Sequence, residues 1–505
     1  MKDSMSDTVR IELLPLGRRL TVAAGTSLQD ALFPQGVEFP CGGRGRCKGC
    51  RVRVLEGNLP VTPEDERVLT PRERAEGWRL ACRAHVCSDL RIELAQWELS
   101  ILSDNSTFAF TPRDGLGAAV DLGTTTIVAQ LVDRRTGNVL GVRMGLNRQS
   151  KHGADIMSRI DFAMSSGGQT TLQTLVREQI GGLLAELMSE APPGAPLERV
   201  VLVGNTVMHH LFCGLSVEPL SHHPFDPPED GPKTFSASDL GWHGLGNATV
   251  CFLPCLGGFV GSDVLAGIVA TQVDGSDRLV GLVDLGTNGE IVIGNRDRLL
   301  CASTAAGPAF EGARISMGMR AATGAIAEVA LHDSAMQCRV LGGGAPRGIC
   351  GSGLVDAVAC GLDLGLVRPT GRLASGDQWT LAAPVVLTQA DVRELQLAKG
   401  AIAAGFRLLL AQWGAGLEDL ECLHLAGAFG NYINRASARR IGLLPLPPDR
   451  VRPAGNTALL GAKLALFRES GDGFEYGALR PKIRHVPLNE DPDFHDIYVS
   501  EMQFP

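Results

Sequence analysis

The sequence predicts a multidomain protein in which a small α+β domain precedes a larger α/β unit built from two similar halves. Three observations support this prediction. Residues 41–50 combine cysteine and glycine within a region of short alternating strands. A polar, turn-rich segment follows, and beyond it the motif Asp-x-Gly-Thr occurs twice, each time between two apolar, β-branched runs. We expect a first domain at 1–97, a linker at 98–115, a first lobe at 116–278 and a second lobe at 279–505.

Composition narrows the class of protein. The chain has 505 residues, a net charge of -8 and 44% hydrophobic residues, which is enough apolar material for several globular domains. The beginning of the chain lacks an apolar signal region, and the apolar run at 251–270 is broken by Pro254 and Asp263. The 13 cysteines occur mostly singly, in apolar contexts. We therefore expect a cytoplasmic protein with reduced thiols and without nucleic-acid or membrane partners.

The first domain is expected to be rich in strands. Residues 8–22 alternate apolar and polar side chains about a Gly-Arg turn, and residues 26–33 indicate a short capped helix. Further strands are expected within 47–59 and 89–94.

Four cysteines of this domain predict a metal centre. Cys41, Cys47 and Cys50 are spaced C-x5-C-x2-C, and Cys82 follows after a charged helical segment. This is close to the plant-type pattern for a [2Fe-2S] cluster, and glycines let such a loop bring amide groups towards the sulfurs. Structural zinc and a redox CxxC pair are the alternatives, but zinc usually shows two close pairs, and a redox pair leaves Cys41 and Cys82 unexplained. Cys87 is an alternative fourth ligand; the context of Cys82 favours Cys82.

Basic residues surround the cysteine loop. They are consistent with a docking rim for an acidic redox partner and equally with an ordinary solvated strand face. These residues are Arg44, Arg46, Lys48, Arg51 and Arg53.

The two Asp-x-Gly-Thr turns predict a pair of phosphate-binding hairpins. Glycine lets the backbone approach an anion, Thr hydroxyl groups and turn N–H groups bind phosphate oxygens, and an Asp at the end of a strand can hold Mg²⁺ through water. One such tetrapeptide alone is a weak signal, because Asp-x-Gly also simply ends strands. The chain has no P-loop motif. Two such turns that face each other across a cleft would be able to bind the phosphates of a nucleoside triphosphate between them.

His209 and His210 suggest a metal or corrinoid ligand. No further ligand spacing accompanies them, so the start of a helix packed on a sheet is the favoured interpretation.

Further segments connect these pieces to known families. Residues 251–270 and 451–467 resemble the two interlobe helices of the actin, sugar-kinase and heat-shock-chaperone (ASKHA) superfamily, and residues 420–445 resemble its adenosine-binding strand and helix. Over essentially its whole length the chain resembles the reductive activators of corrinoid-dependent enzymes, the RACE family. The motifs that carry this resemblance are CGGRGRCKGC, VDLGTTTIVAQLVD, NRQSKHGADIMSRI, VLVGNTVMHHLF, LPCLGGFVGSDVLAG, VDLGTNGEI, GPAFEGARISMGM, GICGSGL, TQADVRELQLAKGAI, AGAFGNYIN and FHDIYVSEMQFP.

The resemblance implies a fold and a set of sites. The fold would be a β-grasp ferredoxin-like domain followed by a duplicated RNase H-like, two-lobed ATPase. Cysteines Cys41, Cys47, Cys50 and Cys82 would hold the cluster. A nucleotide with Mg²⁺ would lie between Asp121, Gly123, Thr124 and Thr125 on one side and Asp284, Gly286, Thr287 and Asn288 on the other, with Gly427 and Gly430 flanking the adenosine. Glu290 would orient the attacking water or Mg²⁺, or would simply be a charged strand residue.

The resemblance also implies a reaction. One electron would pass from the cluster to a corrinoid methyltransferase protein whose cobalt has been oxidised to inactive Co(II), restoring Co(I), and ATP binding or hydrolysis would prevent back-transfer. An upstream electron donor would reduce the cluster, and a homodimer is an expectation from the family. The corrinoid belongs to the partner, because the nearest approach to a base-off corrinoid motif, DFHDIY, has Tyr498 where Gly is required.

Three other functions remain open from the sequence. A redox-regulated small-molecule kinase would show ATP turnover that depends on a hydroxyl substrate. A ferredoxin electron carrier with a non-catalytic dimerisation platform would not bind nucleotide. Activators of radical dehydratases place a cluster between subunits and lack a fused ferredoxin.

Overall fold

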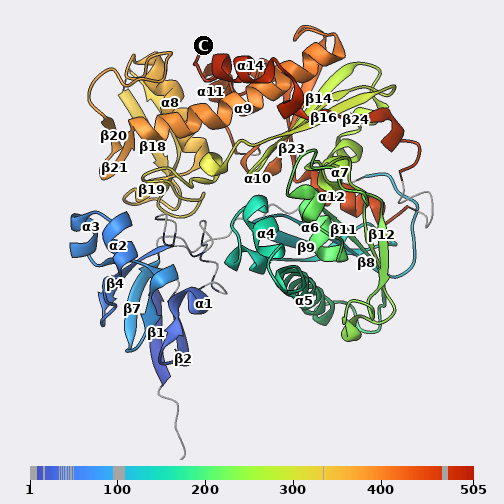
Figure 1. The fold of residues 1–505 in the computed structure, drawn as a ribbon, viewed down its shortest axis with the longest axis horizontal. Coiled ribbons are helices and arrows are strands. Elements are labelled where there is room, and N and C mark those ends of the chain that lie inside the picture. Colours follow the sequence, from blue (N-terminus) through green and yellow to red (C-terminus); the bar gives the residue numbers. More distant parts are fainter. Residues whose placement is uncertain are drawn as a thin grey trace, which may run out of the picture.

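The computed structural model describes residues 8–14, 17–32, 35, 37, 39, 43, 45, 48, 50–94, 108–333, 335–430, 432–468 and 476–505. Two of the predicted cluster ligands, Cys41 and Cys47, lie outside the described residues, as do Arg44, Arg46 and residues 98–107 of the expected linker. Figure 1 shows an N-terminal domain in blue, a first lobe in teal and green, and a second lobe in yellow to red.

The N-terminal domain is a five-stranded mixed sheet of order β2-β1-β7-β4-β5. Its first and last strands, β1 and β7, are parallel neighbours, and the remaining pairs are antiparallel. The alternation predicted for the first strand is present, since Val9, Ile11 and Leu13 are buried. The elements are β1 (Thr8–Leu14), β2 (Arg18–Ala23), β3 (Thr26–Ser27), α1 (Leu28–Leu32), β4 (Arg51–Glu56), α2 (Pro63–Val68), α3 (Pro71–Ala75), β5 (Trp78–Leu80), η2 (Ala81–Arg83), β6 (His85–Val86) and β7 (Leu90–Leu94).

The first lobe (lobe I) has a six-stranded sheet of order β10-β9-β8-β11-β13-β12. Phe108 and Phe110, at the end of the expected linker, attach to it through Phe467, with ring centroids 5.3 and 4.5 Å away. The elements are β8 (Leu116–Leu122), β9 (Thr126–Asp133), β10 (Val139–Leu146), η3 (Arg148–Lys151), α4 (Ile156–Ala163), α5 (Gly168–Ser189), β11 (Leu197–Gly204), α6 (Thr206–Cys213), η4 (Glu218–Leu220), β12 (Lys233–Ser236), η5 (His243–Leu245), β13 (Thr249–Phe252), α7 (Ser262–Thr271) and η6 (Val273–Gly275).

The second lobe (lobe II) has a six-stranded sheet of order β23-β22-β14-β15-β16-β24 and a smaller region with β17 to β21. The elements are β14 (Leu279–Leu285), β15 (Gly289–Gly294), β16 (Leu299–Thr304), η7 (Pro308–Glu311), β17 (Ala325–His332), β18 (Ala335–Val340), β19 (Gly348–Ile349), α8 (Gly351–Asp363), β20 (Gln378–Ala382), β21 (Val385–Thr388), α9 (Gln389–Trp413), β22 (Leu420–Ala426), α10 (Gly427–Gly430), α11 (Arg435–Arg440), η8 (Pro448–Arg450), β23 (Val451–Gly455), α12 (Thr457–Ala465), η9 (Arg480–Lys482), β24 (Ile483–His485), η10 (Leu488–Glu490) and α14 (Phe494–Glu501).

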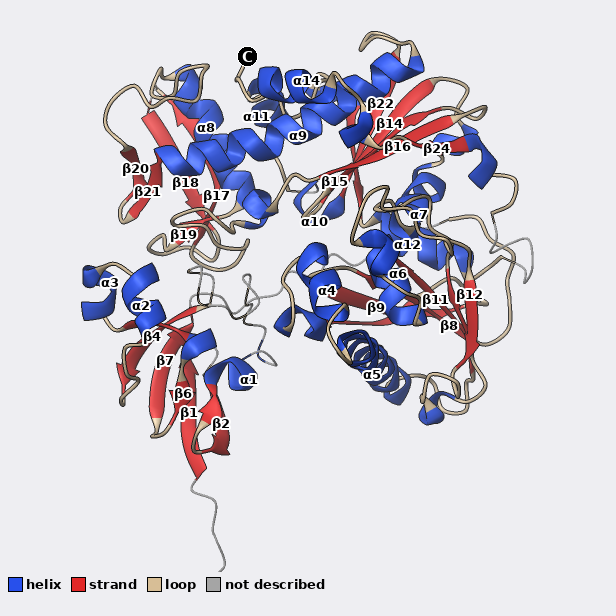
Figure 2. Cartoon of the chain, in the orientation of Figure 1, coloured by secondary structure: helices blue, strands red, loops and turns tan. Residues whose placement is uncertain are grey.

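The two sheets confirm the predicted duplication. In each lobe a hairpin pairs the first two strands and a third antiparallel strand follows. A fourth strand joins the first in parallel and a fifth joins the fourth in parallel, so β10-β9-β8-β11-β13 matches β16-β15-β14-β22-β23. Figure 2 shows helices on both faces of these sheets. The strand β12 in lobe I and the strand β24 in lobe II are additions at the sheet edges.

Two helices, α7 and α12, lie between the lobes. In α7, Leu265 packs into the cluster of the lobe I sheet, whereas Val264 and Ile268 pack into a cluster of the lobe II sheet. The two helices approach closely, because a Cβ atom added to Gly461 would lie 2.3 Å from the carbonyl oxygen of Ala266. The predicted interlobe helices are therefore both present.

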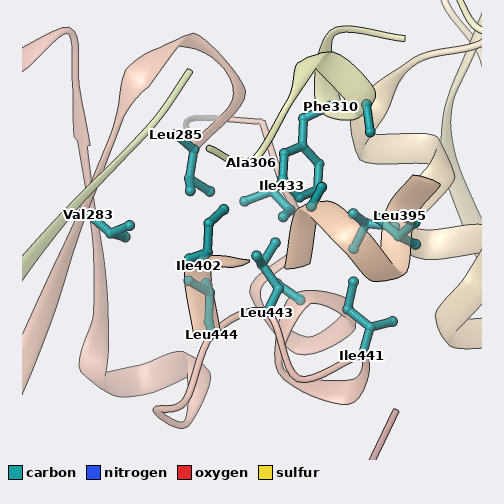
Figure 3. Packing of buried hydrophobic residues seen from close by; sticks show 14 of the residues in the cluster. Val283, Leu285, Ala306, Phe310, Leu395, Ile402, Ile433, Ile441, Leu443 and Leu444 are labelled. Carbon is teal, nitrogen blue, oxygen red and sulfur yellow. The ribbon is translucent and has the colours of Figure 1, made fainter. Parts of the chain in front are cut away.

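The largest core belongs to lobe II and supports its first hairpin from behind. Figure 3 shows Leu285 of β14 near Ile402 of α9 and Phe310 of η7, in a cluster that also includes Ile433 and Leu443. The apolar face of α9 is accounted for by this packing within the chain. Among the described residues, none of the helices combines the length and apolarity needed to cross a bilayer.

The paired histidines are core residues, as the favoured interpretation expects. His209 and His210 are buried in α6, and the ring of His209 meets Phe252 edge to face at 4.9 Å. Burial lowers the pKa of His209 to about 3, so this side chain stays neutral.

Candidate functional site

Two of the predicted cluster ligands meet in the N-terminal domain. Cys50 and Cys82 are brought together by the pairing of β4 with β5 and by a hydrogen bond of 3.1 Å from the amide of Ala81 to the carbonyl of Cys50. Both thiols are buried, whereas Cys87 is exposed after β6. The burial supports the sequence preference for Cys82 over Cys87.

The described part of the cysteine loop fits a bound cluster. Gly43 and Gly45 have φ of 73° and 63°, which L side chains rarely adopt. A Cβ atom on Gly43 would lie 2.5 Å from Oε1 of Gln29, and one on Gly45 would lie 2.6 Å from Cγ of Glu64. The loop therefore favours glycine at these two positions, as expected of a backbone that follows the domain closely and would bind an iron-sulfur cluster.

The described basic residues around the loop are engaged inside the domain. Lys48 forms an ion pair of 2.8 Å with Glu73, and Nε of Arg53 donates to the carbonyl of Glu76 at 2.9 Å. Arg51 lies over the ring of Trp78, and burial lowers its pKa. For these three residues the local structural role explains the charge without a docking partner.

We expect Cys82→Ser to lose the visible absorption and the reduced-state electron paramagnetic resonance (EPR) signal of a [2Fe-2S] cluster. Cys87→Ser should retain both, because an exposed thiol outside the buried pair is not needed as a ligand. Iron and sulfide content per chain measures the difference. Equal losses in the two variants would contradict the assignment.

The first predicted phosphate hairpin joins β8 to β9, and its turn is held from behind. The amide of Asn147 donates to the carbonyl of Thr125 at 2.8 Å, and its side chain donates to the carbonyl of Gly123 at 3.0 Å. The guanidinium of Arg159 donates to the carbonyl of Thr124. A trans peptide directs its C=O and N–H groups oppositely, so N–H groups of the turn face the other side, as an anion site requires.

Arg159 is a buried cation behind this turn. Its side chain is fully buried, and burial lowers its pKa to about 9. Besides the carbonyl of Thr124, it donates to the carbonyl of Gly153 at 2.9 Å and to Oε1 of Gln149 at 3.2 Å. At neutral pH it remains charged and supplies positive potential beneath the turn.

The second predicted hairpin joins β14 to β15. The amide of Gly286 donates to the carbonyl of Asn288 at 3.0 Å. The hydroxyl of Thr287 donates to Oε1 of Glu311 in η7 at 2.6 Å. This contact differs from the sequence expectation, because it directs the Thr287 hydroxyl proton to a carboxylate instead of a phosphate.

The glycines expected to flank adenosine lie at the end of β22, next to the second hairpin. Gly427 has φ of 86°, and a Cβ atom there would lie 2.5 Å from Oδ1 of Asp284 and 2.6 Å from the carbonyl oxygen of Leu285. A Cβ atom on Gly430 would meet only the side chain of Leu425 within 3.4 Å, at 3.1 Å from Cγ. The need for glycine is therefore much stronger at Gly427.

Two asparagines connect helices to the first hairpin. Asn205 caps α6 and donates from Nδ2 to Oγ1 of Thr124 at 2.9 Å. Asn456 caps α12 and donates from Nδ2 to Oδ2 of Asp121 at 3.0 Å. The side chains of both predicted hairpin residues are thus oriented by the start of a helix.

Four carboxyl groups from the two lobes interact electrostatically in this region. Asp284 stands directly opposite Glu290 in the β14–β15 pair. Burial raises the pKa of Asp121 to about 6. Burial and then the repulsion of neighbouring carboxylates raise the pKa of Asp263 and Asp284 to about 7 and that of Glu290 well above its ordinary value. The site is therefore well suited to a cation.

The donor set fits Mg²⁺ held through water. Within the part of the chain that the structure describes, no group of three His, Cys, Asp or Glu side chains is placed to bind a metal ion directly. Mg²⁺ commonly keeps several waters and uses few carboxylates together with phosphate oxygens. Asp121 and Asp284 at the ends of their strands suit this arrangement.

Several residues of this site are absent from the sequence expectations. Asn205 and Asn456 occur in the same tripeptide, Gly-Asn-Thr, once in each lobe, and this internal repetition was an available signal. Asp263 lies in the first turn of α7, where an acid also suits the helix dipole. Glu311 and Arg159 carry no local signal, because only the folded chain brings them to the hairpins.

Comparison with known proteins covers most of the chain. Residues 279–505 match the family model described as the C-terminal domain of RACo, the ASKHA domain, and residues 116–276 match the RACo middle region. Residues 11–87 match the 2Fe-2S iron-sulfur cluster binding domain, which favours iron-sulfur over zinc at the cysteine site.

Individual relatives agree with these models. The corrinoid activation enzyme RamQ of Eubacterium limosum is 36% identical over 442 residues, which are 80% of this chain and 74% of RamQ. The Co(II) methylated amine-specific corrinoid protein reductase of Methanosarcina barkeri is 28% identical, covering 77% of each chain. A solved structure titled reductive activator for corrinoid, iron-sulfur protein superposes with a TM-score of 0.69 and 27% identity over 98% of both chains. The chain belongs to the family of reductive activators of corrinoid-dependent enzymes.

Proposed function

We propose that this protein reduces the cobalt of a corrinoid methyltransferase protein from inactive Co(II) to Co(I), and that ATP drives this reduction. One observation carries the proposal: a ferredoxin-type domain is joined, in one chain of this family, to two lobes that each contain a hairpin of the kind predicted to bind phosphate. When bound, a reduced [2Fe-2S] cluster supplies one electron: the cluster is oxidised by one electron and one Co(II) is reduced to Co(I). An upstream electron donor then reduces the cluster again.

The residues that hold the cluster are proposed from spacing and burial. Cys50 and Cys82 lie together in the described core, and Cys41 and Cys47 complete the spacing in the sequence. A reducing cytoplasm is the compartment that suits this thiol-rich chain.

The nucleotide is proposed to lie between the two hairpins. Asp121, Gly123, Thr124 and Thr125 would hold phosphate and hydrated Mg²⁺ from lobe I, and Asp284, Gly286, Thr287 and Asn288 from lobe II. Thr287 would act through its main chain, because its hydroxyl donates to Glu311. Gly427 and Gly430 would flank the adenosine. Glu290 lies opposite Asp284 with a raised pKa, which suits a group that orients the attacking water or Mg²⁺.

ATP is needed because the electron transfer is uphill. Plant-type clusters have potentials near about -400 mV, and Co(I) is a stronger reductant. A nucleotide can shift the balance only if it binds two conformations of the complex with different affinities. Two lobes that both contact one nucleotide provide such a difference whenever the lobes change their relative position.

An anaerobic EPR experiment tests the proposal. Reduced protein is mixed with a Co(II) corrinoid protein of the same organism, with and without MgATP, and the Co(II) signal is followed. We expect MgATP-dependent loss of this signal with the wild type and with Cys87→Ser, and no loss with Cys50→Ser. A signal that persists although cluster and nucleotide are both bound would contradict the proposed function.

A further inference from the structure

A short segment at the end of β10, residues 146–151, lies between the first hairpin and the ferredoxin domain. We call it the connecting segment. Its inner side supports the hairpin, since Asn147 donates to the carbonyls of Gly123 and Thr125, and Gln149 accepts from the same Arg159 that donates to Thr124.

The connecting segment is also fixed to the body of lobe I. Gln179 of α5 donates from Nε2 to the carbonyl of Leu146 at 2.7 Å and accepts from the amide of Arg148 at 2.8 Å. The first half of the segment, from Leu146 to Arg148, therefore cannot shift independently of α5.

The outer side of the connecting segment receives the ferredoxin domain. Leu146 is 5% exposed and belongs to the hydrophobic cluster of the ferredoxin domain, with Leu28 and Leu32 of α1 among its members. Lys151 forms an ion pair of 2.7 Å with Asp30 of α1. The ion pair is partly exposed and adds little to the stability of the contact by itself. The buried Leu146 therefore supplies most of that stability, and the ion pair fixes how the two surfaces are aligned.

A second contact joins the ferredoxin domain to lobe II. Glu93 of β7 forms an ion pair of 2.6 Å with Arg347, which immediately precedes β19. In Figure 1 the ferredoxin domain lies beneath β19 and beside α4. The domain thus contacts both lobes, as the proposed nucleotide does.

We propose that docking of the ferredoxin domain on the connecting segment and Arg347 is thermodynamically linked to nucleotide binding, each favouring the other. This inference rests on the proposed function, because it requires a nucleotide at the two hairpins. Docking further restrains the segment whose Asn147 holds two carbonyl groups of the first turn, those of Gly123 and Thr125, so a docked domain removes part of the entropy cost of ordering that turn around phosphate. If docking raises the affinity for nucleotide by some factor, the bound nucleotide must raise the equilibrium constant of docking by the same factor.

Variants on the ferredoxin side test this linkage without touching the hairpins. The full-length, cluster-loaded protein is titrated calorimetrically with Mg²⁺ and a non-hydrolysable ATP analogue. Asp30→Lys and Glu93→Arg are each expected to raise Kd about 5-fold, the lower end of typical allosteric coupling. Arg19→Glu, a charge reversal in the exposed strand β2, serves as the matched control and should leave Kd unchanged.

The paired exchange Asp30→Lys with Lys151→Asp should restore the wild-type Kd, which a merely misfolded domain would not do. Hydrogen exchange supplies the reciprocal measurement: the nucleotide analogue should slow exchange in α1 and in the connecting segment of the wild type. If Asp30→Lys proves unstable by its cluster absorption, Asp30→Ala replaces it.

The outcomes separate the two ideas. Unchanged Kd in both undocking variants, with normal binding by the wild type, would overturn the linkage and leave the proposed function standing. If the wild type bound no nucleotide, the proposed function and the linkage would both fall. A weaker Kd in the undocking variants, rescued by the exchange, would establish the linkage.

Discussion

Glu290→Gln is expected to slow ATP turnover by at least about 100-fold and to stabilise the protein in the absence of nucleotide. The first effect follows from its proposed role in orienting water or Mg²⁺. The second follows from its position opposite Asp284, where two half-buried carboxylates repel each other. A neutral amide of the same shape removes that repulsion.

The sign of the pH dependence follows from the raised pKa values. Between the unfolded pKa of a carboxyl group and its higher folded pKa, the folded protein binds more protons than the unfolded chain. The free energy of unfolding therefore falls as pH rises through that window, which for Asp284 ends at about 7. The wild type should lose stability from about pH 4 to about pH 7, and Glu290→Gln should lose less.

Urea unfolding at the two pH values measures this effect, and Mg²⁺ with the ATP analogue should reduce the pH dependence of the wild type. Glu421→Gln is the matched control, because Glu421 is an exposed glutamate on β22 of the same sheet. Identical pH profiles for wild type and Glu290→Gln would show that the carboxyl groups do not interact as inferred.

Gly427→Ala is expected to destabilise the protein by about 2 kcal/mol or more and to weaken nucleotide binding at least about tenfold. A Cβ atom there would collide with the carbonyl oxygen of Leu285 and the carboxylate of Asp284, in a backbone conformation that disfavours L side chains. The carbonyl belongs to β14 and has little room to move. Any adjustment must therefore displace the second hairpin.

Gly430→Ala is the matched control for this prediction. Its new Cβ atom meets only a leucine side chain at close range, so we expect a change in stability below about 1 kcal/mol and a smaller loss of nucleotide affinity than in Gly427→Ala. Thermal unfolding and calorimetric titration of both variants make the comparison. Equal behaviour would contradict the inferred contact between Gly427 and the second hairpin.

The sequence was sufficient where a local pattern carries the information. Alternating burial predicted β1, and the repeated Asp-x-Gly-Thr turns predicted two hairpins and a duplicated fold, because strands and tight turns are encoded by neighbouring residues. The family resemblance and the fold class are confirmed by the comparisons.

The contacts that complete the site could not be predicted in this way. In the sequence, Arg159 is one basic residue in a segment that forms a short helix. Only the folded chain buries it against Thr124, which is 35 positions away. The pair of Lys151 and Asp30 joins residues separated by 121 positions. Such contacts depend on how helices cross the sheet and where a separate domain docks, which a local pattern does not encode.

The close approach of α7 and α12 restricts how the lobes can move. Because Gly461 meets the backbone at Ala266 without an intervening side chain, pulling the lobes apart would break a dense contact, whereas turning them about it would preserve most of it. The motion available is then close to a single rotation, and displacement grows with distance from its axis. A small rotation that begins at the hairpins would produce its largest displacement at the periphery, where Arg347 meets the ferredoxin domain.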